Sequence, residues 1–323
     1  MEVLGNKISS FKILENLADT KLLGDCLSCT YASRKVIYFP TCQKRREHVI
    51  KIEDYDVYSF DLDGTIYVGD RLLPGAVETL EYIRSNGKKV RFITNSSNLS
   101  REECKERLER LGLTIQLEEV VTALYLAGLY FKEQYPAARV YVVGDDQVKT
   151  ELHRQCIETI DDPAKATHVL VGHDRAFSYD RIQHAMNAIY QGAKLIVINP
   201  DPICPVPNGY IPDTMTFAKA IEVASGRAID QIIGKPTHYY ADRLLEISET
   251  DPNRILIVGD RLETDIMLGQ AHGFATCLVL TGVVSKQDIP KSRIKPDYVI
   301  ENLSELFAFE LPLEKSHLFE QHL

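Results

Sequence analysis

The chain has 323 residues, an apolar content of 45% and a formal net charge of −9. This length exceeds the usual size of a single hydrophobic core, so we expect two domains. The acidic balance argues against nucleic acid or an anionic membrane as the main partner, because either one requires an excess of Lys and Arg on one face.

The N-terminal segment, residues 1–50, contains cysteine and histidine residues at spacings that resemble a metal-binding pattern. Cys26 and Cys29 form a Cys-x-x-Cys pair, Cys42 follows after twelve residues, and His48 follows after five more. This spacing is close to that of a small zinc module, but the expected apolar residues around such a module are missing. The segment is therefore interpreted either as a zinc site or as a poorly ordered extension.

From residue 55 onward, short apolar runs alternate with amphipathic stretches, as in a parallel sheet covered by helices. Three predicted strands run directly into polar residues: 57–60 into Asp61, 90–93 into Thr94, and 255–258 into Gly259-Asp260. Further strands are predicted at 140–143, 168–171 and 195–198, and helices at 75–86, 101–111, 179–191 and 215–224. Because ligands bind beyond the carboxyl ends of parallel strands, we expect the polar residues to meet in one crevice.

Acidic residues dominate these strand ends. Asp61, Asp63 and Asp260 would concentrate negative charge that needs a cation, and Mg²⁺ fits because it prefers oxygen ligands. A calcium loop beginning at Asp61 is excluded, since it would need Gly and Glu where the chain has Ile66 and Leu72. Gly144-Asp145-Asp146 resembles Gly259-Asp260, because both follow a predicted strand. We interpret the 144–146 segment as an ordinary polar strand end, with a metal site as the alternative.

Two other motifs offer groups for a phosphate. Thr94 and Asn95 follow a predicted strand, and their hydroxyl, amide and main-chain N–H groups suit a phosphate oxygen, with helix capping as the alternative. Lys235 lies between Gly234 and a proline, and its ammonium group is suited to neutralise phosphate. Asp265 follows Asp260 by about one helical turn.

These four motifs, in this order, resemble those of the haloacid dehalogenase-like (HAD) superfamily of phosphatases. Within that superfamily the chain resembles the nitrophenylphosphatase/NagD-like branch, subfamily IIA, which carries a C2-type cap. The resemblance implies an α/β fold with a Rossmann-like parallel-sheet core and an inserted α/β cap. It assigns Asp61 as nucleophile and metal ligand, Asp63 as acid, base and main-chain metal ligand, Asp260 as metal ligand, and Asp265 as a group that orients Lys235 or a metal-bound water.

The resemblance covers residues from about 55 to about 311. It predicts core segments 51–122 and 233–311, a cap at 123–232, the extension 1–50 and a tail at 312–323. In this branch the loop that contains Arg175 faces the active site, where Arg175 would clamp an anionic leaving group; a surface arginine is the alternative. Relatives usually have a small, glycine-containing stretch where this chain has Pro212-Asp213-Thr214-Met215-Thr216, so the natural substrate stays open.

The leading hypothesis is an Mg²⁺-dependent phosphatase that hydrolyses small phosphate monoesters, such as sugar, glycerol or similar metabolite phosphates and p-nitrophenyl phosphate, through an aspartyl-phosphate. The odd number of cysteines, seven, and the lack of a signal segment or long apolar run favour the cytoplasm. We expect a small phosphate ester as partner, with no nucleic acid and no membrane; a homo-oligomer remains open.

The rival hypothesis is a non-catalytic or regulatory module that binds a phospho-ligand or a protein. A mere binder would not need both Asp61 and Asp63, which weighs against it.

Overall fold

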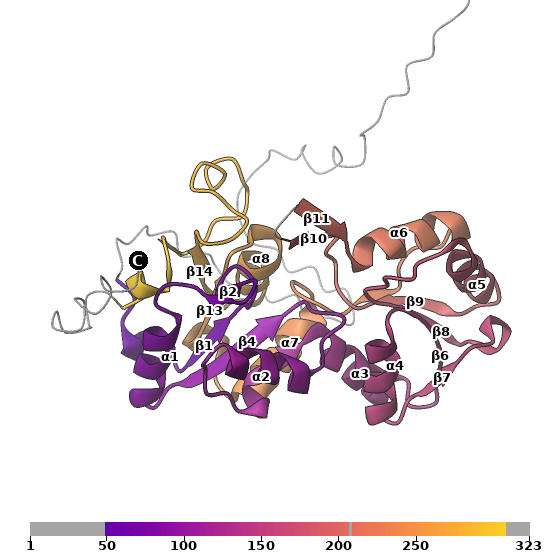
Figure 1. Ribbon diagram of the computed structural model, residues 1–323, viewed down its shortest axis with the longest axis horizontal. Coiled ribbons are helices and arrows are strands. Elements are labelled where there is room, and N and C mark those ends of the chain that lie inside the picture. The colour runs from indigo at the N-terminus through magenta and orange to yellow at the C-terminus, as the bar shows by residue number, and fades with distance from the viewer. Residues whose placement is uncertain (1–48, 207–208, 308–323) are drawn as a thin grey trace, which may run out of the picture. The chain divides into compact units, whose positions relative to one another are not determined.

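The computed structural model describes residues 49–206 and 209–307 (Figure 1). Its larger sheet has six parallel strands in the order β15-β14-β13-β1-β4-β5. The strands are β1 (Val57–Phe60), β4 (Lys89–Thr94), β5 (Val120–Thr122), β13 (Ile255–Gly259), β14 (Ala275–Val279) and β15 (Tyr298–Ile300). All four residues of β1 are buried, because both faces of the sheet are covered.

Strand β1 lies where the strand order reverses. The chain proceeds from β1 through β4 to β5 on one side, and later from β13 through β14 to β15 on the other side. The crevice beyond the carboxyl ends of β1, β4 and β13 is therefore the position where open parallel sheets bind ligands.

A second sheet has five parallel strands in the order β12-β9-β8-β6-β7. They are β6 (Arg139–Val143), β7 (Glu158–Ile160), β8 (His168–Val171), β9 (Lys194–Val197) and β12 (Gln231–Ile232). Two hairpins complete the strands: β2 (Tyr67–Val68) with β3 (Arg71–Leu72), and β10 (Ile203–Val206) with β11 (Gly209–Pro212).

The helices are joined to the strands by short loops. They are α1 (Ala76–Ser85), α2 (Arg101–Arg110), α3 (Ala123–Gln134), α4 (Asp146–Arg154), α5 (Tyr179–Tyr190), α6 (Thr214–Ser225), α7 (His238–Ser248) and α8 (Met267–His272) (Figure 1). Helix α2 begins with a capping box, in which Ser100 accepts from the Glu103 N–H and the Glu103 carboxylate accepts from the Ser100 N–H. In the described ranges no helix is long and apolar enough to cross a bilayer.

Helix α3 connects the two sheets through one apolar cluster. Its buried residues Leu126 and Phe131 share this cluster with Ile257 of β13 and with Val140 of β6. The opposite face of the second sheet has a separate cluster, in which Val143 and Phe217 are members. The second sheet therefore has a core of its own on one face and shares the core of the six-stranded sheet on the other.

The predicted α/β fold with parallel sheets is confirmed, and every predicted strand and helix lies within one residue of its observed bounds. The sequence analysis did not predict four helices, α3, α4, α7 and α8, or five strands of the two parallel sheets, β5, β7, β12, β14 and β15, or the two hairpins. Helix α3 is apolar on nearly all sides because it is packed between two sheets, so it lacks the one-sided periodicity that marks a surface helix.

Burial of His168 generates a prediction about acid stability. His168 lies in β8 with 6% of its surface exposed, and its ring packs against Phe131 and Tyr135 at 5.3 and 4.5 Å between centroids. Burial, assisted by the nearby Lys194, lowers the pKa of His168 from 6.5 to about 4. As the pH falls, His168 therefore takes up a proton in the unfolded chain before it does so in the folded chain. The contribution of neutral His168 to the free energy of unfolding is fully present above pH 6.5 and is lost as the pH falls toward 4.

We expect the free energy of unfolding to fall by about 3 kcal/mol between pH 6.5 and 4 on account of His168. Urea unfolding at several pH values measures this, with His168→Phe expected to have a smaller fall and the exposed His153→Gln the parental one. An unchanged pH dependence in His168→Phe would show that the prediction is wrong.

Candidate active site

The structure brings the predicted motifs together around one crevice of about 850 Å³. Its lining includes Asp61, Asp63, Thr94, Asn95, Lys235, Asp260 and Arg175. Asp265 lies beneath this surface and is completely buried. Residues from the ends of β1, β4 and β13 thus meet as the strand pattern predicted.

Lys235 lies between two carboxylates at the base of the crevice. Its Nζ atom is 2.6 Å from Asp61 Oδ1 and 2.6 Å from Asp265 Oδ1, and it also donates to the main-chain oxygen of Ile93 at 3.2 Å. Burial lowers the pKa of Lys235, but the carboxylates of Asp265 and Asp61 raise it further, so the net pKa is above its ordinary value. The ammonium group therefore stays protonated and points at the carboxylate that ends β1.

Three carboxylates form a compact acidic group. Asp61, Asp260 and Asp265 each have an oxygen within 4.8 Å of the others'. Burial and the neighbouring Asp265 raise the pKa of Asp260 to about 6. Burial also raises the pKa of Asp61, with Asp265 and Asp260 adding to the effect against the opposing effect of Lys235.

The donor set fits a divalent cation. Asp260 Oδ2 accepts from the Val283 N–H at 2.8 Å, whereas the buried Oδ1 atom has no hydrogen-bond partner among the described residues. Both carboxylate oxygens of Asp265 accept hydrogen bonds, one from Lys235 Nζ and the other from the Arg261 N–H. Asp61 and Asp260 are thus the carboxylates available to a hard cation, whose charge would favour their ionised forms.

Two glycines make room for Asp260. A Cβ atom on Gly64, where φ is +87°, would lie 2.6 Å from Asp260 Oδ2, and one on Gly282 would lie 1.9 Å from the same atom. Gly282 was not identified as a site residue from the sequence. Both positions require glycine because the Asp260 carboxylate passes directly over the backbone.

Asp63 lies beside Asp61 and is exposed toward the crevice. Its Oδ2 atom accepts from the Tyr67 hydroxyl at 3.2 Å, and the Arg107 guanidinium lies 4.3 Å from the centre of the Tyr67 ring. Loss of hydration within the crevice raises the pKa of Asp63 above its ordinary value, although Arg107 opposes this shift. A raised pKa suits a carboxyl group that exchanges a proton near neutral pH.

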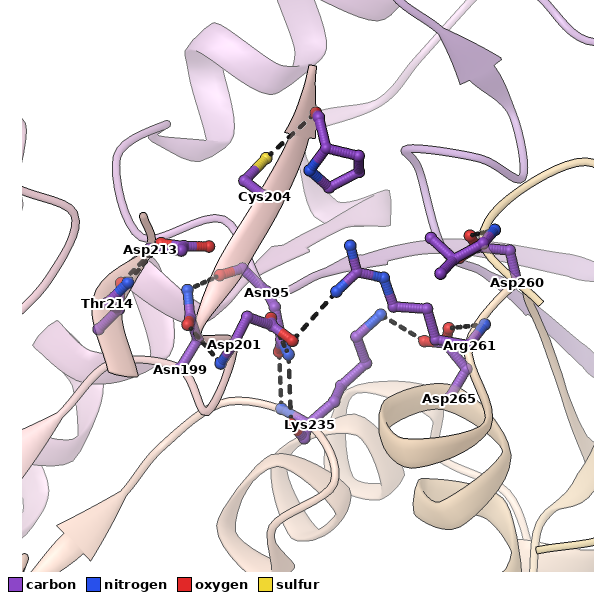
Figure 2. Close-up of polar contacts among 12 residues, drawn as sticks. Asn95, Asn199, Asp201, Cys204, Asp213, Thr214, Lys235, Asp260, Arg261 and Asp265 are labelled. Carbon is purple, nitrogen blue, oxygen red and sulfur yellow. Dashed lines mark hydrogen bonds and ion pairs between the residues drawn. The ribbon is translucent and has the colours of Figure 1, made fainter. Parts of the chain in front are cut away.

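A hydrogen-bond network connects the second sheet to Lys235 (Figure 2). Asn95 Oδ1 accepts from the Lys235 N–H at 2.8 Å, and Asn95 Nδ2 donates to Asp201 Oδ2 at 2.9 Å and to the Lys235 carbonyl at 3.2 Å. Asp201 Oδ1 is 3.3 Å from Arg261 Nη1, and Asn199 Nδ2 donates to the Asn95 carbonyl at 2.7 Å. The Asn95 side chain therefore fixes the backbone of Lys235.

Sequence reasoning missed Asn199, Asp201 and Arg261. A signal was present, because Asn199-Pro200-Asp201 follows a predicted strand and Arg261 directly follows Asp260. Thr94 Oγ1 accepts from the Ser96 N–H at 3.1 Å, which holds the turn after β4. The side chain of Arg175 has no hydrogen bond or ion pair within the described part of the chain, and it lines the crevice.

The remaining candidate metal sites have different outcomes. Asp145, in the Gly-Asp-Asp segment at 144–146, contacts His173 Nδ1 at 3.1 Å and accepts a hydrogen bond from the Arg175 N–H at 3.1 Å. Its carboxylate therefore holds the loop that contains these two residues. The zinc candidates Cys26, Cys29, Cys42 and His48 lie outside the described residues.

Two family models match this chain. A haloacid dehalogenase-like hydrolase model matches residues 58–158, and a HAD-hydrolase-like model matches residues 232–306. An acid sugar phosphatase from Staphylococcus saprophyticus is 31% identical over 255 residues, which cover 79% of this chain and 98% of that protein. The chain belongs to the haloacid dehalogenase-like hydrolases.

Solved structures agree with this assignment. This HAD-like hydrolase is similar to 4-nitrophenylphosphatase from Thermotoga maritima, with a TM-score of 0.76, 32% identity, and coverage of 80% of this chain and 98% of that one. A glycerol phosphate phosphatase from Mycobacterium tuberculosis, solved in complex with calcium, has a TM-score of 0.73 and 29% identity, over 79% and 75% of the two chains. The predicted family, its nitrophenylphosphatase-like branch and the HAD-type phosphoric monoester hydrolase are confirmed.

The Asp201 network generates a prediction about catalysis. Asp201→Ala removes the acceptor for both Asn95 and Arg261, so the Asn95 side chain that holds the Lys235 backbone loses one of its anchors. We expect kcat to fall about 10- to 100-fold with little change in KM, the usual effect of removing a group that orients a site residue. Steady-state kinetics on one ester measures this. Asp230→Ala is the matched control, because Asp230 also accepts a hydrogen bond, from the Leu195 N–H, but lies outside the Asp201 network. A kcat of Asp201→Ala within about 2-fold of the parental value would contradict the role of this network in catalysis.

Proposed function

We propose that this protein is an Mg²⁺-dependent phosphatase that hydrolyses small phosphate monoesters through an aspartyl-phosphate on Asp61. The observation that carries the proposal is the 2.6 Å contact between Lys235 and Asp61 at the end of β1, beside an acidic group in which Asp260 Oδ1 is buried and has no hydrogen-bond partner among residues 49–206 and 209–307. A carboxylate held this way is oriented for attack on phosphorus.

In the proposed reaction, Asp61 attacks phosphorus and the bond from phosphorus to the ester oxygen breaks. Asp63 donates its proton to the leaving alkoxide, then accepts a proton from the water that attacks the aspartyl-phosphate. Phosphate leaves and both carboxyl groups return to their starting states. Lys235 donates a hydrogen bond toward the charge that moves between Asp61 and the phosphoryl oxygens.

Asp61, Asp260 and the main-chain carbonyl of Asp63 would hold the Mg²⁺ ion. When bound there, the ion supplies positive charge that offsets the charge of the phosphate and the carboxylates. Thr94 and the loop held by Asn95 would bind phosphate oxygens. Asp265 would orient Lys235, which the 2.6 Å contact between them supports.

The substrate is proposed to be a small metabolite phosphate. Relatives are named for acid sugar phosphatase, 4-nitrophenylphosphatase and glycerol phosphate phosphatase activities. We propose that 51–122 and 233–311 form the core and that 123–232 form a cap, whose Arg175 contacts an anionic leaving group. A crevice of about 850 Å³ suits a small ester better than a folded phosphoprotein.

A cytoplasmic location is proposed because Cys104, Cys156, Cys204 and Cys277 are free thiols.

Substitution of the two carboxylates tests the mechanism. Asp61→Asn is expected to abolish turnover while the fold persists, because the amide keeps the shape but cannot attack phosphorus. Asp63→Asn is expected to slow turnover at least ~100-fold, the scale of losing a general acid–base group. Release of phosphate from p-nitrophenyl phosphate measures both, with circular dichroism to confirm folding. Near-parental kcat in either variant rules the mechanism out.

Metal removal is the second test. We expect EDTA to abolish activity and Mg²⁺ to restore it, since buried carboxylates need a compensating cation. Ca²⁺ takes more ligands at longer distances and is expected to inhibit weakly. Phosphatase assays on chelated and reloaded enzyme measure this, and full activity after chelation would exclude the proposed cofactor.

A further inference from the structure

The carboxyl group of Asp63 is held by a single side chain in the described part of the chain. Its Oδ2 atom accepts a hydrogen bond from the Tyr67 hydroxyl at 3.2 Å, and no other residue of that part donates to either oxygen. Asp63 is exposed and lines the crevice. Asp61 differs, because its carboxylate is held by the charged Lys235. The placement of the Asp63 carboxyl group therefore depends on one phenol.

From this contact we infer that Tyr67 is a positioning residue for proton transfer to the leaving group. Its hydroxyl holds Oδ2 of Asp63 and leaves Oδ1 to carry the proton that the ester oxygen receives. The inference rests on the proposed phosphatase function, in which Asp63 is the general acid, and adds a residue that acts through it.

The chemistry of the two groups decides which carboxyl oxygen carries the proton. A protonated carboxyl group has one O–H donor, while its other oxygen only accepts. The Tyr67 hydroxyl donates to Oδ2, so a proton on Oδ1 preserves this hydrogen bond, whereas a proton on Oδ2 would compete with it. When the bond from phosphorus to the ester oxygen breaks, that oxygen takes the Oδ1 proton and Asp63 becomes a carboxylate. The attacking water later returns a proton to Oδ1.

Tyr67 is itself fixed relative to Asp63. Its side chain is 1% exposed and belongs to the apolar cluster of the six-stranded sheet. In the main chain, the Gly64 N–H donates to the Tyr67 carbonyl at 2.8 Å, and the Tyr67 N–H donates to the Leu62 carbonyl at 3.3 Å. These two hydrogen bonds close the turn that contains Asp63. The chain thus returns to place the phenol beside the carboxyl group.

Arg107 of α2 restrains the same ring from another element. Its guanidinium lies 4.3 Å from the centre of the Tyr67 ring, and its Nη2 atom donates to the Gly69 carbonyl at 3.1 Å. Gly69 lies in the turn between β2 and β3, so Arg107 holds both the ring and its hairpin. A phenol restrained in this way can direct the carboxyl group before substrate binds.

The alternative is that Tyr67 only fills the core and its hydroxyl contacts Asp63 incidentally. Two aryl esters of similar shape separate these roles. Phenolate is a strong base, with an ordinary pKa of about 10 for a phenol, and needs a proton as it leaves. The nitro group makes p-nitrophenolate a weaker base, which leaves more readily without one. A misplaced acid therefore slows phenyl phosphate selectively, whereas a disturbed core slows both esters alike.

The test measures kcat/KM of Tyr67→Phe, since this quantity includes release of the alcohol but not the later hydrolysis of the aspartyl-phosphate. We expect a fall of about 10- to 100-fold for phenyl phosphate and of less than about 3-fold for p-nitrophenyl phosphate. Tyr58→Phe is the matched control. Tyr58 is buried in the same cluster, but its hydroxyl donates to the Ile52 carbonyl at 3.1 Å and it lies outside the crevice lining. Its ratio of the two kcat/KM values is expected to stay parental.

A double variant tests whether Tyr67 acts through Asp63. Asp63→Asn already lacks the transferable proton, so adding Tyr67→Phe is expected to change single-turnover hydrolysis of phenyl phosphate, at high enzyme concentration, by less than about 2-fold. Equal losses on both esters in Tyr67→Phe, no loss on phenyl phosphate, or the full loss in the Asp63→Asn background overturns the inference and leaves the phosphatase function intact. If the parental enzyme hydrolyses neither ester, the phosphatase function itself fails.

Discussion

The buried ammonium group of Lys235 is the constraint on which the candidate site depends. With 1% of its surface exposed, Lys235 keeps its charge only because Asp61 and Asp265 each accept a hydrogen bond from it at 2.6 Å. Leaving a buried charge without its partner costs about 3–5 kcal/mol, so all three positions are set together. Gly259 belongs to the same constraint, because a Cβ atom there would lie 2.3 Å from the Asp265 carboxyl carbon.

The second sheet is joined to this site in two physically different ways. Apolar packing through α3 places Val140 and Ile257 in one cluster, and hydrogen bonds from Asp201 reach Lys235 through Asn95. Packing fixes the distance between the sheets, while the hydrogen bonds fix the direction of individual groups. The wall that would contact the leaving group is thus positioned before substrate arrives, which reduces the ordering needed for reaction.

The sequence predicted the fold and the meeting of the motif residues at one crevice, because parallel strands with two buried faces are continuous apolar runs that end there. It did not predict α3, whose burial removes the amphipathic pattern, or the β10–β11 hairpin, whose two strands have only four residues each. Asp201 and Gly282 were also missed. Asp201 follows a predicted strand, but its partner Asn95 is distant in sequence and cannot be read from that position. No local pattern marks Gly282, whose importance lies in its closeness to Asp260.

The account's central claim is that Asp61 becomes covalently phosphorylated. Enzyme that is turning over p-nitrophenyl phosphate can be quenched in acid, reduced with borohydride and analysed by peptide mass spectrometry, because reduction converts an aspartyl-phosphate to homoserine. The account predicts homoserine at position 61, dependent on substrate and absent from Asp63 and Asp260. Modification of another carboxylate, or none at position 61 when rapid-quench kinetics show a burst of p-nitrophenol, would contradict it.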